Sequence, residues 1–236
     1  SYFKIRIFFI LFFFININNL NARDIGETEI TAEEGIEVFQ NEKYYLLKKN
    51  VKIESDNFSL VGDIIKIYFG KDLYDILKID AVGNVLLDSL TYNIMANGKK
   101  LLFTVKDEEI IIEGDNSKLI TESTEMFSDG NIKVNNIDGD FYLNGANSKL
   151  ISENIIIQGN SINGIFALNN GQKEIMLLDV FDEKIAYVKS NDTDMFANSI
   201  KYNKDISLIE LEKNVKIMSD GETITGDYGT LDIKTN

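Results

Sequence analysis

The stretch from Ile76 to Asp88 reads ILKIDAVGNVLLD and decides the fold class of this chain. Apolar and polar residues alternate along it, which is typical of a half-buried β-strand because successive side chains leave opposite faces of the pleat. Gly83 and Asn84 interrupt the run without breaking the alternation, so we expect one long strand that is kinked there. The residues on the expected apolar face are Leu77, Ile79, Ala81, Val85 and Leu87.

Strand-length apolar runs continue from Ile30 towards the end of the chain, separated by turns that carry Asp, Asn and Gly. The apolar alternation changes phase across Gly62-Asp63, which predicts a bulge there. Asn97-Gly98 has the composition of a turn between two strands. No stretch shows the spacing of a long amphipathic helix. The sequence therefore predicts an all-β protein.

Short segments of the sequence recur, which indicates one small unit stacked several times. The clearest recurrence is KNVKI, found at residues 49–53 and again at residues 213–217. A third copy is GNVLL at residues 83–87, and NSKLI occurs at both 116–120 and 147–151. We see no linker between the repeats and expect a single domain over residues 23–236, built from repeated hairpins with Gly83-Asn84 at the fold point of one of them.

The first 22 residues resemble an export signal rather than part of the fold. Lys4 and Arg6 precede an unbroken apolar run from Ile7 to Ile15, and Ala22 is a small residue at a suitable cleavage position. Such a run is too short to span a bilayer as a helix, which needs about 20 residues. We expect a signal peptide over residues 1–22, with a retained membrane anchor as the alternative.

Composition excludes several kinds of chemistry. The chain has 236 residues and contains no Cys, His, Pro or Trp. It can therefore form neither a thiolate nucleophile, an imidazole base nor an ordinary zinc site, and we expect no catalytic residue, metal or cofactor. The net charge is −14, so nucleic acid is not an expected partner. Acidic groups such as Asp138-Gly139-Asp140 and Asp192-Thr193-Asp194 read as turns rather than calcium sites.

Alternation alone leaves the closure of the strands open. A two-layer sandwich, an elongated jelly roll and a β-helix all have an apolar inner face and a polar outer face.

Two segments resemble the OstA-like family of lipopolysaccharide-transport proteins, also called the LptA family. Residues Ile79 to Val85 match its pattern of Ile or Leu, any residue, Ala, any residue, Gly-Asn-Val, and Ile224 to Asp232 are similar to a pattern that ends its repeats. The resemblance covers residues of about 30–125 and 185–236. It implies an elongated, open, V-shaped β-jelly roll of antiparallel strands that follows a signal peptide.

The resemblance also implies a function. Family members are non-enzymatic periplasmic proteins that shield the lipid A acyl chains of lipopolysaccharide during transport to the outer membrane. It implies head-to-tail self-association and contact with other transport components through the end strands, here Ile30–Phe39 and Gly229–Ile233. The residues expected to line the apolar interior are Val51, Ile53, Ile67, Phe69, Ile79, Val85, Leu87, Phe103, Val105, Leu211, Val215 and Ile217.

Two other functions fit the same residues. One is a secreted β-helical enzyme acting on polysaccharide, which needs clustered carboxylates in a groove. The other is a structural or adhesin-like repeat protein with a closed core and no ligand.

Overall fold

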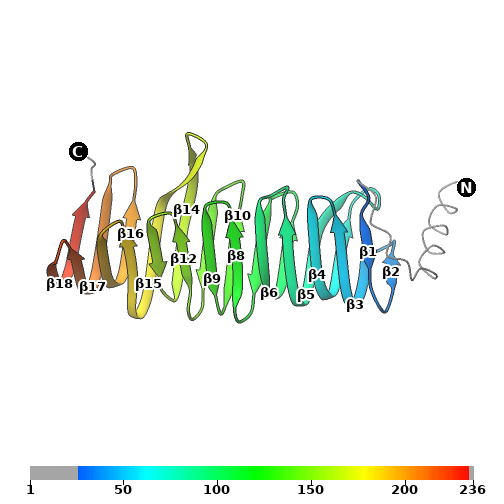
Figure 1. Ribbon diagram of the computed structural model, residues 1–236, viewed down its shortest axis with the longest axis horizontal. Coiled ribbons are helices and arrows are strands. Elements are labelled where there is room, and N and C mark those ends of the chain that lie inside the picture. Colours follow the sequence, from blue (N-terminus) through cyan, green and yellow to red (C-terminus); the bar gives the residue numbers. More distant parts are fainter. Residues whose placement is uncertain (1–25, 234–236) are drawn as a thin grey trace, which may run out of the picture.

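A computed structural model describes residues 26–233, and these residues form one continuous sheet of antiparallel strands (Figure 1). The all-β prediction is confirmed. The sheet is long and narrow, and its strands follow one another along the long axis of the molecule. In chain order the strands are β1 (Glu29–Thr31), β2 (Ile36–Phe39), β3 (Tyr44–Ser55), β4 (Phe58–Phe69), β5 (Ile76–Ser89), β6 (Ile94–Thr104), β7 (Glu109–Glu113), β8 (Ser117–Thr121), β9 (Thr124–Ser128), β10 (Asn131–Asn135), β11 (Asp140–Asn144), β12 (Lys149–Ser152), β13 (Ile155–Gln158), β14 (Ser161–Asn169), β15 (Gln172–Ser190), β16 (Thr193–Asn203), β17 (Leu208–Ser219) and β18 (Glu222–Asp232).

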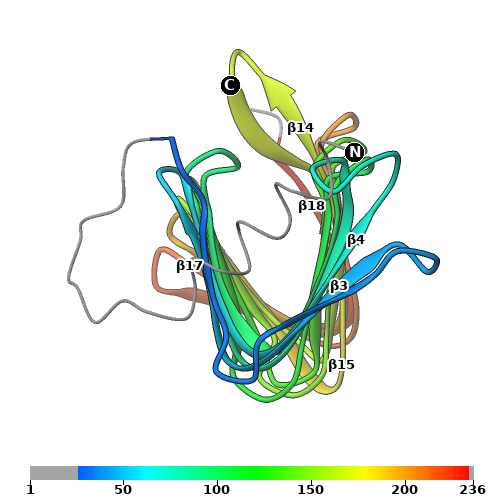
Figure 2. The ribbon, with the colours of Figure 1, turned by 90° about the vertical axis from the view of Figure 1, so that its right-hand side faces the viewer.

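The sheet is folded lengthwise into two walls that meet along one edge and stand apart at the other (Figure 2). We call the closed edge the apex and the open edge the mouth. One wall ends in β1 and the other in β2, and we name the walls after these strands. Every strand pairing among residues 26–233 is antiparallel, so the fold is the V-shaped open jelly roll and not a β-helix.

The long strands at both ends of the molecule belong to both walls because each bends at the apex. β3 pairs through Glu29↔Glu54 with β1 and through Ile36↔Leu47 with β2, with a register shift between these halves. The same shift occurs in β5, where Gly83 and Asn84 have φ angles of 81° and 48°. Left-handed backbone suits Gly and Asn, and here it turns the strand through the corner.

The sequence repeats coincide with this corner. Lys49 and Asn50 have φ angles of 66° and 47°, and Lys213 and Asn214 have 64° and 54°. The recurrent Asn-Val segments are therefore copies of one bend at the apex. Gly62-Asp63 lies at the apex too, at the predicted change of phase in β4. The bends lie within strands, however, and not between the two strands of a hairpin.

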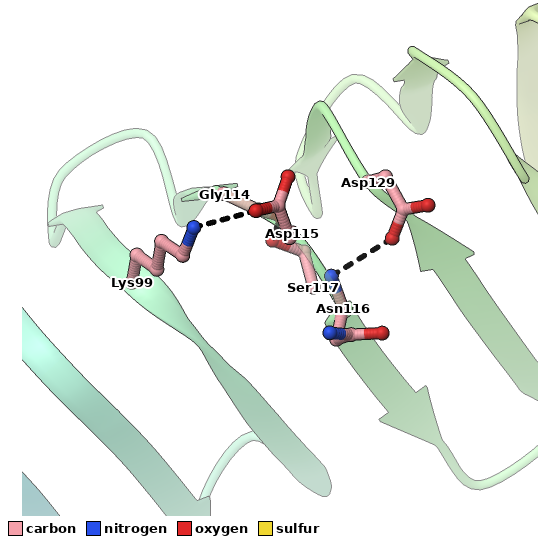
Figure 3. Close-up of polar contacts among 6 residues, drawn as sticks. All are labelled: Lys99, Gly114, Asp115, Asn116, Ser117 and Asp129. Carbon is pink, nitrogen blue, oxygen red and sulfur yellow. Dashed lines mark hydrogen bonds and ion pairs between the residues drawn. The ribbon is translucent and has the colours of Figure 1, made fainter.

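In the middle of the molecule the chain passes the apex in turns and not in bent strands. From β7 to β13 the strands have four or five residues, each hairpin stays on one wall, and the chain crosses between walls in turns. Polar side chains join these turns (Figure 3). The Lys99 ammonium lies 2.6 Å from the Asp115 carboxylate, and the Asn116 backbone N–H donates to Asp129 at 2.9 Å. Asn147 Nδ2 donates to the other oxygen of Asp129, so one carboxylate ties two repeats together.

Two local predictions need correction. Asn97-Gly98 does not separate two strands, because it lies inside β6 where that strand bends at the apex. Leu77 has the alternation of an inward residue but is 46% exposed. A register shift between Tyr68 and Phe69 places Ile76 opposite Phe69, which reverses the phase at the start of β5.

The predicted signal peptide, residues 1–22, lies outside the described residues. Within residues 26–233, no helix has the length and apolar character that crossing a membrane requires.

Candidate functional site

The inner faces of the two walls form a continuous apolar interior. Hydrogen-bonded neighbours place one side chain from each strand in a row that runs the length of the wall. On the β2 wall one row near the apex includes Leu47, Ile65, Ala81, Leu101 and Ile112, all at most 1% exposed. The walls touch at this depth and leave no room for a ligand.

The interior becomes accessible towards the mouth. Half-buried apolar side chains there pack on the core with one side and face the opening with the other. They come from both walls and from most of the length of the molecule: Phe58, Ile76, Ile79, Tyr92, Ile94, Val105, Val134, Ile155, Phe166 and Tyr202.

The residues expected to line the interior divide between these two depths. Nine are buried: Val51, Ile53, Ile67, Phe69, Val85, Leu87, Phe103, Leu211 and Val215. Ile79, Val105 and Ile217 are half-buried and pack against the core. The second group offers surface towards the mouth, and among the buried residues Phe103 and Leu87 also reach openings of the interior.

A cleft of about 950 Å³, which we call the central cleft, opens near the middle of the mouth. Its apolar lining comes from the turn before β6, from β6 to β12 of both walls and from the tip of the β14–β15 hairpin: Tyr92, Ile94, Phe103, Ile110, Leu119, Ile120, Val134, Ile151 and Leu168. A smaller apolar recess adjoins it and is lined by residues that include Ile79, Leu87 and Phe103.

Sequence reasoning identified Phe103 in this cleft but missed Ile94, Ile110, Leu119 and Val134. These four share the alternation of the predicted residues, so the strand pattern contained the signal. The strand pattern did not reveal how deep each residue lies between apex and mouth, because that depth depends on how the walls diverge.

The β14–β15 hairpin projects beyond the rim and leans over the mouth (Figure 2). Lys173 near its tip donates to Asn136 Oδ1 at 2.6 Å, on the turn that follows β10. The adjacent residue Glu174 forms an ion pair with Lys204 from the turn after β16. Leu168 is 72% exposed and lines the central cleft, so the hairpin presents apolar surface to the opening.

The row of inward side chains nearest the mouth on the β1 wall is rich in hydroxyl groups, which we call the hydroxyl row: Ser55, Ser89, Thr121, Thr124, Ser152, Ser190, Thr193 and Ser219. Several bond to nearby backbone, as Ser152 does to the Ser123 carbonyl at 3.3 Å. The apolar side chains of Phe58, Ile94 and Ile155 lie at the same level between them. The rim of this wall is therefore a mixture of hydroxyl and apolar groups.

The titration of the tyrosines gives no sign of catalysis. Burial raises the pKa of Tyr45 to about 12, and its hydroxyl donates to the Leu73 carbonyl. Burial and the hydrogen bond to Asp194, at 2.6 Å, raise the pKa of Tyr187 to about 12. Both phenols are protonated at neutral pH and cannot serve as bases. Among residues 26–233, no group of three or more acidic side chains could hold a metal ion.

Comparison with known proteins gives little. No protein-family model matches the chain, and no curated protein is similar to it. Among solved structures it is similar to LptH, described as the LptA-homologous periplasmic component of the conserved lipopolysaccharide transport device from Pseudomonas aeruginosa. The match has 14% identity and a TM-score of 0.39, and covers 46% of this chain and 76% of LptH. A likeness at this level carries no weight for function.

Proposed function

We propose that this protein is a non-enzymatic periplasmic carrier that holds the lipid A acyl chains of lipopolysaccharide on their way to the outer membrane. The observation that carries the proposal is the central cleft, where half-buried aliphatic and aromatic side chains of two walls line an opening of about 950 Å³. A carrier needs an apolar surface that water reaches only from one side, and the mouth of the V supplies it.

Transfer of an acyl chain into such a cleft is favourable by roughly 0.8 kcal/mol for each buried CH₂ group. No reaction is needed for this gain. The chains lie in the upper half of the trough, over residues such as Ile79, Ile94 and Val105, because the rows near the apex are already packed. The sugar part of the lipid stays outside, next to the hydroxyl row.

The two ends of the sheet support head-to-tail self-association and docking of other transport components. Among residues 26–233, β18 pairs with β17 alone, and Ile224 and Tyr228 on it are 63% and 60% exposed. At the other end, within the same described residues, β2 pairs with β3 alone, and Val38 is 43% exposed. A free strand edge with exposed apolar residues accepts a further strand, and such addition would extend the trough from one molecule into the next.

The test compares two neighbouring residues of β6. Ile94 faces the cleft, whereas Met95 lies on the outer face and is 53% exposed. Ile94→Glu places a charge among the acyl chains, and Met95→Glu adds the same charge outside.

We expect mass spectrometry to find lipid A in gently purified parent protein and in Met95→Glu, and to find several-fold less in Ile94→Glu. Absence of lipid from the parent protein, or equal amounts in both variants, would contradict the proposal. A structural repeat protein without a ligand is the second candidate, favoured by the sealed rows near the apex, and it predicts that an apolar fluorescent probe binds to none of the three proteins.

A further inference from the structure

We infer that the central cleft prefers amphiphiles whose polar group carries a positively charged amine over those with an exposed phosphate. This rests on the proposed function, because it concerns the head group of the lipid that the cleft holds. Three features carry it: the charge along the rim, the pairing of the carboxylates at the cleft, and the hydroxyl groups that lie just below the carboxylates.

The rim of the β1 wall is acidic along its length. Among the described residues, five of its hairpin turns carry a carboxylate, and none of its turns carries Lys or Arg. The carboxylates are those of Asp56, Glu122, Glu153, Asp192 and Asp220. The turns of the β2 wall differ, because they combine acidic residues with lysines such as Lys71 and Lys106.

Three glutamates line the central cleft at hairpin turns, Glu122 and Glu153 from the β1 wall and Glu108 from the β2 wall. Glu122 accepts a hydrogen bond from Asn93 at 3.2 Å, and Glu108 accepts one from Asn136. Amides are neutral, so these bonds orient the carboxylates without cancelling their charge. The ion pairs found among residues 26–233 do not include these three glutamates.

Lys173 is the basic residue that lines the cleft, and its ammonium is held by Asn136. Glu125 of β9 also lines the cleft, so one ammonium among four carboxylates leaves the opening negative. A phosphate at the rim would meet repulsion from both sides, whereas an ammonium group would lie between carboxylates of opposite walls.

The layers beneath the rim suit the same ligand. Thr121 and Thr124 lie just below the carboxylates at the same level as Ile94, and Leu119 lies one step deeper in the same cleft. A molecule with an amine, a hydroxyl-bearing portion and an apolar chain would meet matching groups in that order. A glycolipid whose phosphates carry amine substituents has this character.

The test uses three amphiphiles of equal chain length, dodecylammonium, dodecyl phosphate and dodecyl glucoside, each below its micelle concentration and in the presence of a chelator. Their affinities for the whole protein are measured by displacement of an apolar fluorescent probe. We expect dodecylammonium to bind about tenfold more tightly than dodecyl phosphate at roughly 0.01 M salt, and this ratio to fall towards one at about 1 M salt.

The double variant Glu122→Gln/Glu153→Gln should reduce the ratio while leaving dodecyl glucoside unaffected. Asp205→Asn, on the opposite rim and outside the cleft lining, is the matched control and should change nothing. Equal binding of the three amphiphiles would overturn the inference but not the carrier function. Failure of all three to displace the probe, or failure of the probe to bind, would overturn both.

Discussion

Replacement of Gly83 by alanine tests whether the bend at the apex depends on close packing as well as on left-handed backbone. The φ angle of Gly83 is 81°. A Cβ atom built there would lie 2.2 Å from Asp63 Oδ2 and 2.8 Å from Asp63 Cβ. Gly221, in the turn between β17 and β18, has a φ of 80° but no atom within 4 Å of the same Cβ position. The two glycines therefore have nearly the same left-handed backbone angle, and an added Cβ atom would meet close neighbours only at Gly83.

Both substitutions incur the cost of left-handed backbone with a Cβ atom, roughly 1–2 kcal/mol. At Gly83 the carboxylate of Asp63 must also rotate away, which breaks its 3.1 Å hydrogen bond with Asn84 Nδ2. That bond is worth roughly 0.5–1.5 kcal/mol. Rotation does not relieve the contact with Asp63 Cβ, so the backbone must shift as well, at roughly 1–3 kcal/mol. We expect losses of roughly 2.5–6.5 kcal/mol for Gly83→Ala and roughly 1–2 kcal/mol for Gly221→Ala.

Urea unfolding followed by circular dichroism gives the free energy of unfolding of each variant. The double variant Asp63→Gly/Gly83→Ala removes the crowding atoms and should lose less than the sum of its single changes. Equal losses for Gly83→Ala and Gly221→Ala would refute the reasoning, and would mean that the apex needs glycine for its backbone alone.

Three further predictions follow from the same structure. Hydrogen bonds from the Asn116 backbone and the Asn147 side chain hold the pKa of Asp129 below its ordinary value of 3.8, so Asp129→Asn should destabilise the protein at neutral pH. The lowered pKa of Asp129 stabilises the fold fully above the pKa of the unfolded chain, and this contribution is lost as pH falls through the folded pKa. The difference between the two proteins in urea unfolding should therefore shrink as the pH is lowered below 3.8. Ile132→Ala, at a fully buried site, should lower the free energy of unfolding by roughly 2–5 kcal/mol, whereas Ile137→Ala, at a site 61% exposed, should change it by less than about 0.5 kcal/mol. Ile224→Lys on the free edge strand should reduce self-association in sedimentation velocity experiments, and unchanged sedimentation would count against docking through β18.

The strands and the kinks were predictable from the sequence because both depend on local chemistry. Alternation in β5 and the left-handed preference of Gly83-Asn84 act over a few residues. The recurrence of Lys-Asn-Val at residues 49–51 and 213–215 located equivalent corners far apart in the chain. The same local reasoning failed at Asn97-Gly98, because a Gly that ends one strand and a Gly that bends a strand have the same composition around them.

The candidate site was less predictable because it depends on the distance between walls. Val51 and Ile79 follow the same alternation, yet one is fully buried and the other lies towards the mouth. The Asn and Gly residues between β14 and β15 have the composition of a turn, but the projection of this hairpin above the rim was not predictable. Nothing in the sequence of β14 or β15 marks where pairing with β11 and β16 stops. Closure into a V was implied by family resemblance alone.

Because neighbouring strands pair along the long axis, the walls can be extended one strand at a time, whereas a compact core cannot. Each strand adds about 4.8 Å to the trough without changing its cross-section, so the length of the lane is set by the number of corners in the sequence. Insertion or loss of one repeat would lengthen or shorten the trough by a fixed step. Molecules joined edge to edge would extend the trough in the same steps. The number of repeats could thus match the length of the protein to the distance that it has to bridge, without any change to the residues of the existing walls.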